Sequence, residues 1–90
     1  MDKIEVEIEN ADMLQTAIEQ DVDIIMFDNQ TPEWIAEHIK AVPAHIQTEA
    51  SGNINENNVV DYAQTGVDYI SMGALFYAQN ALDISAKVVI

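Results

Sequence analysis

The segment IEVEIENADMLQTAIEQDVDIIMFDN (residues 4–29) decides the fold, because it contains two strand patterns joined by one helix pattern. Apolar and acidic residues alternate strictly over residues 4–9, which is the two-residue period of a β-strand with one polar face. Asn10 is a suitable N-cap for the apolar positions with helical spacing that follow it. The short apolar run over residues 23–28 is typical of a strand that is buried on both faces. We therefore expect a strand, a helix and a second strand.

The same order of elements repeats along the rest of the chain. Thr31, Pro32 and Glu33 supply an N-cap, a proline at the first helical position and an early acidic residue for a second helix, which Pro43 ends. Further patterns predict a strand over residues 45–50, a helix over 55–65, a strand over 68–72, a shorter helix over 74–81 and an extended segment over 87–90. Strands and helices that alternate with a period of roughly twenty residues predict right-handed crossovers and a parallel sheet.

The predicted fold class is therefore α/β, with a parallel βαβαβαβ repeat in a single domain over residues 1–90. Such a repeat is about half of a (β/α)₈ barrel, so one expected arrangement is a partial TIM-like barrel. The other is a small open three-layer sheet. A half-barrel leaves the edges of its first and last strands unpaired, and unpaired edges favour association. We expect a two-fold dimer or a larger homo-oligomer, in which the fourth strand or residues 86–90 make the contact.

The composition narrows the possible ligands and partners. Three basic residues face sixteen acidic ones, and the resulting net charge of −13 argues against a nucleic-acid partner. There is no cysteine for a disulfide or a thiolate metal site, and His38 and His45 lack a second histidine at metal-binding spacing. No long apolar run suggests a signal peptide or a membrane span, so we expect a cytoplasmic location. An anionic ligand would need backbone N–H groups, a metal ion or cations from another chain.

Polar residues follow the carboxyl ends of the predicted strands, which is the edge where parallel α/β folds bind their ligands. These residues are Glu7, Asp28, Ser51 with Gly52, and Gly73. Each also has a simpler interpretation. Glu7 fits an exposed strand position, Asp28 fits a cap on the next helix made together with Asn29, and Ser51–Gly52 fits an ordinary turn. The functional alternative for Ser51–Gly52 is a phosphate site before a helix N-terminus.

The segments IEVEIEN, DIIMFDN, TEASGNI, TGVDYISMGAL and ALDIS resemble, in order and spacing, the C-terminal part of the α/β barrel in the quinolinate phosphoribosyltransferase family. This family is also called carboxylating nicotinate-nucleotide pyrophosphorylase. The resemblance implies a transferase of NAD biosynthesis that converts quinolinate and phosphoribosyl pyrophosphate into nicotinate mononucleotide, pyrophosphate and CO₂. It also implies an N-terminal α/β sandwich domain, an incomplete barrel and a dimeric or larger assembly.

The resemblance assigns roles to residues at the strand ends. It places Glu7 and Asp28 at the ribose hydroxyls and the nearby Mg²⁺, which is consistent with the preference of Mg²⁺ for carboxylate oxygens. It places Ser51, Gly52 and Asn53 in a first phosphate loop. Gly73 and Ala74 correspond to a second phosphate loop. The expected ligand is therefore phosphoribosyl pyrophosphate, bound with Mg²⁺.

Two departures from the family pattern limit what the chain is expected to do. Phe76 and Tyr77 stand where the family usually has Thr-His or Thr-Lys, and the only basic residues are three lysines. The family's quinolinate-binding cations lie upstream of the matched segments, so we expect a phosphoribosyl half-site that is inactive without an N-terminal portion. Two alternatives are a non-catalytic, self-associating α/β module and a fragment of the related molybdenum-transport family.

Overall fold

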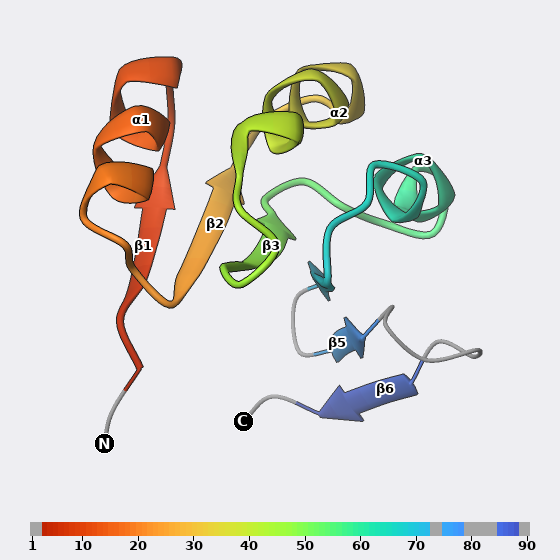
Figure 1. Ribbon diagram of the computed structural model, residues 1–90. Coiled ribbons are helices and arrows are strands. Elements are labelled where there is room, and N and C mark those ends of the chain that lie inside the picture. Colours follow the sequence, from red (N-terminus) through yellow and green to blue (C-terminus); the bar gives the residue numbers. More distant parts are fainter. Residues whose placement is uncertain (1–2, 73–74, 79–84, 89–90) are drawn as a thin grey trace.

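The computed structural model describes residues 3–72, 75–78 and 85–88 (Figure 1). Three helices and a 3₁₀ turn separate the first four strands, and two further strands follow. In chain order the elements are β1 (Glu5–Ile8), α1 (Ala11–Glu19), β2 (Ile24–Asp28), α2 (Pro32–His38), η1 (Ile39–Ala41), β3 (Gln47–Ser51), α3 (Val59–Ala63), β4 (Tyr69–Met72), β5 (Leu75–Ala78) and β6 (Ser85–Val88). No helix among the described residues is long and apolar enough to cross a bilayer.

The strands form one sheet in the order β1-β2-β3-β4-β5-β6. The pairs β1–β2, β2–β3 and β3–β4 are parallel, as the βαβ pattern predicts. The three connecting helices lie on one side of the curved row of strands in Figure 1. A doubly wound three-layer sheet would carry helices on both faces, whereas a barrel wall carries them on one. The α/β class is confirmed, and this one-sided arrangement is that of a partial barrel.

The hydrophobic core lies between the sheet and the helices. One row of paired strand residues (Ile8, Phe27, Ala50 and Ile70) has no exposed surface at all. The helices add buried residues from their inner faces: Leu14, Ala17, Ile35 and Tyr62. Because side chains alternate along a strand, the residues between these positions point to the face of the sheet opposite the helices.

The predicted helix starts are confirmed at two positions. The Asn10 side chain accepts a hydrogen bond from the Met13 backbone N–H at 2.9 Å, and the Thr31 hydroxyl accepts one from the Trp34 N–H at 3.1 Å. Each bond satisfies an N–H group that has no partner within the first turn of its helix. Asp28 and Asn29 do not cap the second helix, so that interpretation of Asp28 is wrong.

The helix predicted over residues 55–65 is shorter in the structure, because α3 begins only at Val59. The Asn58 side chain accepts from the Asn55 N–H at 2.8 Å, and the Asn55 side chain accepts from the Asn57 N–H at 2.8 Å. Asparagine side chains that bond to nearby backbone N–H groups compete with helical bonding. The expected glycine stop is present, since Gly66 has a φ of +99°.

The helix predicted over residues 74–81 is wrong where the structure describes it, because Leu75–Ala78 is strand β5. This strand pairs with β4 in antiparallel register, with Leu75 opposite Met72, so only two residues separate the strands. The sequence Leu-Phe-Tyr is rich in strand-forming residues, and a neighbouring strand edge favours that conformation over a short helix. Residues 74 and 79–81 lie outside the described residues.

The position of β5 also corrects the expected open edge. β4 is paired on both sides, to β3 and to β5, so the fourth strand is not available to another chain. The outermost described strands are β1 and β6. β6 (Ser85–Val88) overlaps the extended segment predicted over residues 87–90, and residues 89–90 lie outside the described residues.

Candidate functional site at the carboxyl edge of the sheet

Asp28 and Ser51 lie side by side at the carboxyl edge of the parallel strands. Asp28 is the last residue of β2, Ser51 is the last residue of β3, and the two are register partners. Both are half-buried. The Asp28 carboxylate has no hydrogen-bond partner among the described residues, and therefore its oxygens remain available to a ligand. The sequence-based expectation that these two residues meet is consistent with this register.

Glu7 lies on the same face of the sheet but closer to the amino ends of the strands. It pairs with Met26, which precedes Asp28 by two residues and therefore shares its face. The Glu7 side chain is exposed. Glu7 and Asp28 thus come from adjacent strands and point to the face opposite the helices, where a ligand spanning the strand ends could meet both.

The loop after β3 has a backbone conformation that requires glycine. Gly52 has a φ of +92° and Asn53 a φ of +57°. A Cβ atom on Gly52 would lie 2.5 Å from Oδ1 of Asn29 and 3.0 Å from the Asn29 backbone nitrogen. No real Cβ atom tolerates such a contact, so the close approach of the two loops depends on the missing side chain.

Hydrogen bonds join the ends of β2 and β3 at this point. The backbone N–H of Asn29 donates to the Ser51 carbonyl at 2.9 Å, and the Asn53 side chain donates to Oδ1 of Asn29 at 2.9 Å. The Asn58 side chain then donates to the Asn53 carbonyl at 3.0 Å. This asparagine-rich turn separates Ser51–Gly52 from α3, which begins at Val59 rather than at the predicted residue 55.

A second set of bonds fixes the neighbouring loop ends. The Gln30 side chain donates to the Glu9 carbonyl after β1 at 2.6 Å, and the Tyr62 hydroxyl of α3 donates to the Gln30 carbonyl at 2.7 Å. Burial raises the pKa of Tyr62 above its usual value, and the Glu33 carboxylate contributes. These contacts tie the loops after β1 and β2 to α3, so the carboxyl edge is held by several independent bonds.

Glu49 is a charged residue near the carboxyl end of β3, two residues before Ser51. It is only 4% exposed, and it occupies the same row of the sheet as Glu7 and Met26. Burial raises the pKa of Glu49 to about 7, and the charges of Glu5 and Glu7 add to this effect. Its position two residues before Ser51 indicates the correct face. Its burial depends on the neighbouring strands and is not visible in the local sequence.

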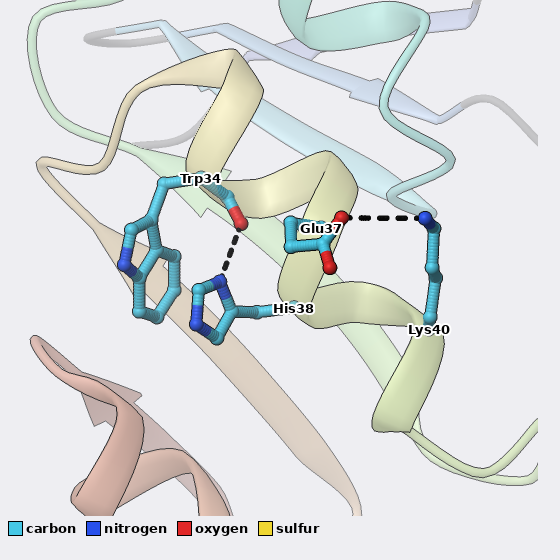
Figure 2. Close-up of polar contacts among 4 residues, drawn as sticks. All are labelled: Trp34, Glu37, His38 and Lys40. Carbon is cyan, nitrogen blue, oxygen red and sulfur yellow. Dashed lines mark hydrogen bonds and ion pairs between the residues drawn. The ribbon is translucent and has the colours of Figure 1, made fainter.

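Lys40 and the two histidines lie away from the Asp28–Ser51 end of the sheet. Figure 2 shows Lys40 in an ion pair with Glu37, at 3.3 Å, at the far end of α2. In the same figure the His38 ring stacks on Trp34 with centroids 3.8 Å apart, and its Nδ1 lies 2.8 Å from the Trp34 carbonyl oxygen. His45 contacts Asp21 at 2.6 Å, between loops that precede strands. Both histidines therefore have partners within the described part of the chain.

Among the described residues no group of three or more histidine, cysteine, aspartate or glutamate side chains is arranged to hold a metal ion. Glu7 and Asp28 are nevertheless chemically suited to Mg²⁺, which commonly binds through one or two carboxylates together with substrate phosphates and water. Gly73 and Ala74, the expected second phosphate loop, lie outside the described residues. The arrangement offers carboxylate oxygens beside a glycine loop with amide groups, and these can meet hydroxyls and an anion respectively.

The fold is that of an α/β protein whose first four strands are parallel, and strand-end carboxylates with a glycine turn form a candidate ligand-binding edge. The chain belongs to the quinolinate phosphoribosyl transferase family: residues 1–87 match the description "Quinolinate phosphoribosyl transferase, C-terminal domain". This finding confirms the resemblance seen in the sequence motifs. It favours neither the molybdenum-transport nor the non-catalytic alternative.

Individual relatives agree with this assignment. A probable nicotinate-nucleotide pyrophosphorylase [carboxylating] of Bacillus subtilis is 46% identical over 88 residues, which cover 98% of this chain and 30% of the relative. The Methanocaldococcus jannaschii protein of the same description is 42% identical over 94 residues, covering 97% of this chain and 33% of the relative. The solved nicotinate-nucleotide pyrophosphorylase of Francisella tularensis superposes with a TM-score of 0.73 at 40% identity, covering 94% of this chain and 31% of that one. The chain thus spans about a third of the length of these relatives.

Proposed function

We propose that the chain forms the phosphoribosyl side of a quinolinate phosphoribosyltransferase active site. The loop Ser51–Gly52–Asn53 receives a phosphate, and Asp28 with Glu7 receives the ribose hydroxyls and Mg²⁺. The observation that carries the proposal is the pairing of Asp28 with Ser51, directly before a glycine at φ +92°. A carboxylate that binds hydroxyls and an open backbone that binds an anion then lie within reach of one sugar phosphate.

The charge of the half-site determines which of the two substrates we expect it to bind. The described half-site is built from carboxylates, amides and backbone groups, which suit a ribose and a magnesium-bound pyrophosphate. Quinolinate is a dianion and needs cations, whereas the net charge of this chain is −13. We therefore expect the quinolinate-binding groups to come from a portion like the one that lies outside the matched third of the relatives, or from another copy. We also propose a cytoplasmic location and a homo-oligomeric state.

Isothermal titration of the chain with phosphoribosyl pyrophosphate, with and without Mg²⁺, tests this proposal. We expect saturable binding that requires Mg²⁺ and that weakens about tenfold or more in Asp28→Asn, because a charged contact is lost. Asp61→Asn, the same change on the exposed side of α3, is the matched control and should bind like the wild type. Absence of wild-type binding, or equal loss in both variants, would refute the assignment of Asp28.

A further inference from the structure

Asn29 occupies the position where the ends of β2 and β3 touch. We propose that Asn29 is a positioning residue that locks the loop Ser51–Gly52–Asn53 to the end of β2 and so holds this loop and Asp28 at one fixed spacing. The ligand-related part of this inference rests on the proposed function. The lock itself consists of the hydrogen bonds of Asn29 with Ser51 and Asn53, which lie within the chain and can be tested without any ligand.

Three features of Asn29 support this role. Its backbone N–H and its side-chain Oδ1 each make a 2.9 Å hydrogen bond across the interface, one with the Ser51 carbonyl and one with the Asn53 side chain. Its own φ is +55°, a left-handed conformation that asparagine adopts more readily than most residues. Its side chain also fills the space that a Cβ on Gly52 would need. Together, the two hydrogen bonds, the positive φ and the packing against Gly52 indicate that Asn29 holds the loop in place.

The consequence for binding is geometric. Asp28 is adjacent to Asn29 in the chain, and the Asn29 bonds fix the loop of the next strand. A ligand with two groups, a sugar hydroxyl and a phosphate, needs both positions at once. A ligand with phosphate alone needs only the loop. Loss of the lock should therefore reduce affinity for the two-group ligand more than for the one-group ligand, because the spacing is no longer set before binding.

Glycine substitutions isolate the side-chain bond, because both asparagines have positive φ values that glycine tolerates. We propose a double-mutant cycle of Asn29→Gly and Asn53→Gly, followed by NMR on the ligand-free chain. Each single variant should accelerate amide hydrogen exchange at residue 29 about 2- to 12-fold, the effect of one lost hydrogen bond. The double variant should show no further acceleration, since both changes remove the same bond.

Two further variants complete the test. Asn57→Gly introduces the same change in the turn before α3, at a side chain that makes no hydrogen bond within the described part of the chain, and it should leave the exchange rate unchanged. Asn29→Asp keeps an acceptor oxygen for Asn53 and should restore slow exchange. Single variants that exchange like the wild type would overturn the proposed lock. So would two effects that multiply in the double variant, because the residues would then act independently.

Titration with ribose 5-phosphate and with inorganic phosphate separates the lock from the proposed function. In Asn29→Gly we expect the affinity for ribose 5-phosphate to fall at least threefold more than the affinity for inorganic phosphate. An equal fall for both ligands would overturn the spacing role. If the wild type binds neither ligand, the spacing role fails. The exchange cycle still decides whether Asn29 locks the loop, and the titration with phosphoribosyl pyrophosphate and Mg²⁺ decides the proposed function.

Discussion

Replacement of Glu49 by glutamine should stabilise the protein at alkaline pH. The pKa of Glu49 is raised from 4.5 to about 7, first by burial and then by the nearby Glu5 and Glu7 charges. The folded state therefore holds a proton that the unfolded state has already released between these two pH values. The stabilising contribution of protonated Glu49 is fully present below about pH 4.5 and is lost as the pH rises through 7. The complete loss corresponds to roughly 3 kcal/mol.

The Glu49→Gln variant keeps the shape of the side chain but cannot ionise. Its free energy of unfolding should exceed that of the wild type by roughly 3 kcal/mol near pH 8.5, with most of the difference gone near pH 5. Urea denaturation followed by circular dichroism across this range measures the difference. Glu56→Gln, which removes one charge from an exposed loop position, controls for the general repulsion in this acidic chain.

Two results would refute this reasoning. Parallel stability curves for Glu49→Gln and Glu56→Gln would mean that Glu49 has no special electrostatic cost. A Glu49→Gln variant that is less stable than the wild type at pH 8.5 would mean that the ionised carboxylate has a stabilising partner. A cation would then lie beside the row of Glu7, Met26 and Glu49 and neutralise the Glu49 carboxylate.

Three other changes test the packing of the carboxyl edge and the assembly. Gly52→Ala should cost about 1–3 kcal/mol more in a urea titration than Gly66→Ala, because both have positive φ but a Cβ at position 66 meets nothing closer than 4.0 Å. Tyr62→Phe should cost about 1 kcal/mol in the same assay, since the hydroxyl donates to the Gln30 carbonyl. Deletion of residues 87–90, which shortens the edge strand β6, should lower the particle mass in size-exclusion chromatography with light scattering; an unchanged mass would contradict a contact there.

The parallel strands and the face that each residue occupies were predictable from the sequence, because the side-chain period of two is a local property. Strict alternation over residues 4–9 placed Glu7 on a polar face, and the apolar run before Asp28 identified β2. The start of α3 was not predictable at the same accuracy. Its position depends on which asparagine side chains bond to the backbone, and several arrangements fit the same residues.

The contacts that shape the candidate site could not be predicted from the sequence, because they join residues that are far apart in the chain. Asn29 and Asn53 are 24 residues apart, and only the register of β2 with β3 brings them together. The burial of Glu49 likewise depends on strands on both of its sides. The β5 hairpin was missed for a related reason: the edge of β4, which favours a strand, is not part of the local pattern of residues 75–78.

Asp28 and the loop Ser51–Gly52–Asn53 include no cation, and this leads to a prediction about salt. A phosphate site made from lysine or arginine loses affinity steeply as salt screens the attraction. Here the described lysine of the helix layer is paired with Glu37, and the whole chain carries a net charge of −13. The long-range field therefore repels an anionic ligand, and screening weakens that repulsion.

The affinity of the chain for ribose 5-phosphate should therefore stay constant or rise when KCl is increased from about 20 to about 200 mM, where the screening length falls below about 10 Å. Isothermal titration at the two salt concentrations measures this, and the Asp61→Asn variant, with one carboxylate fewer, should show a smaller rise. A steep loss of affinity with salt would contradict the reasoning, because it would require a cation at the phosphate position. The neutral amides of the loop Ser51–Gly52–Asn53 would then not be the groups that hold the anion.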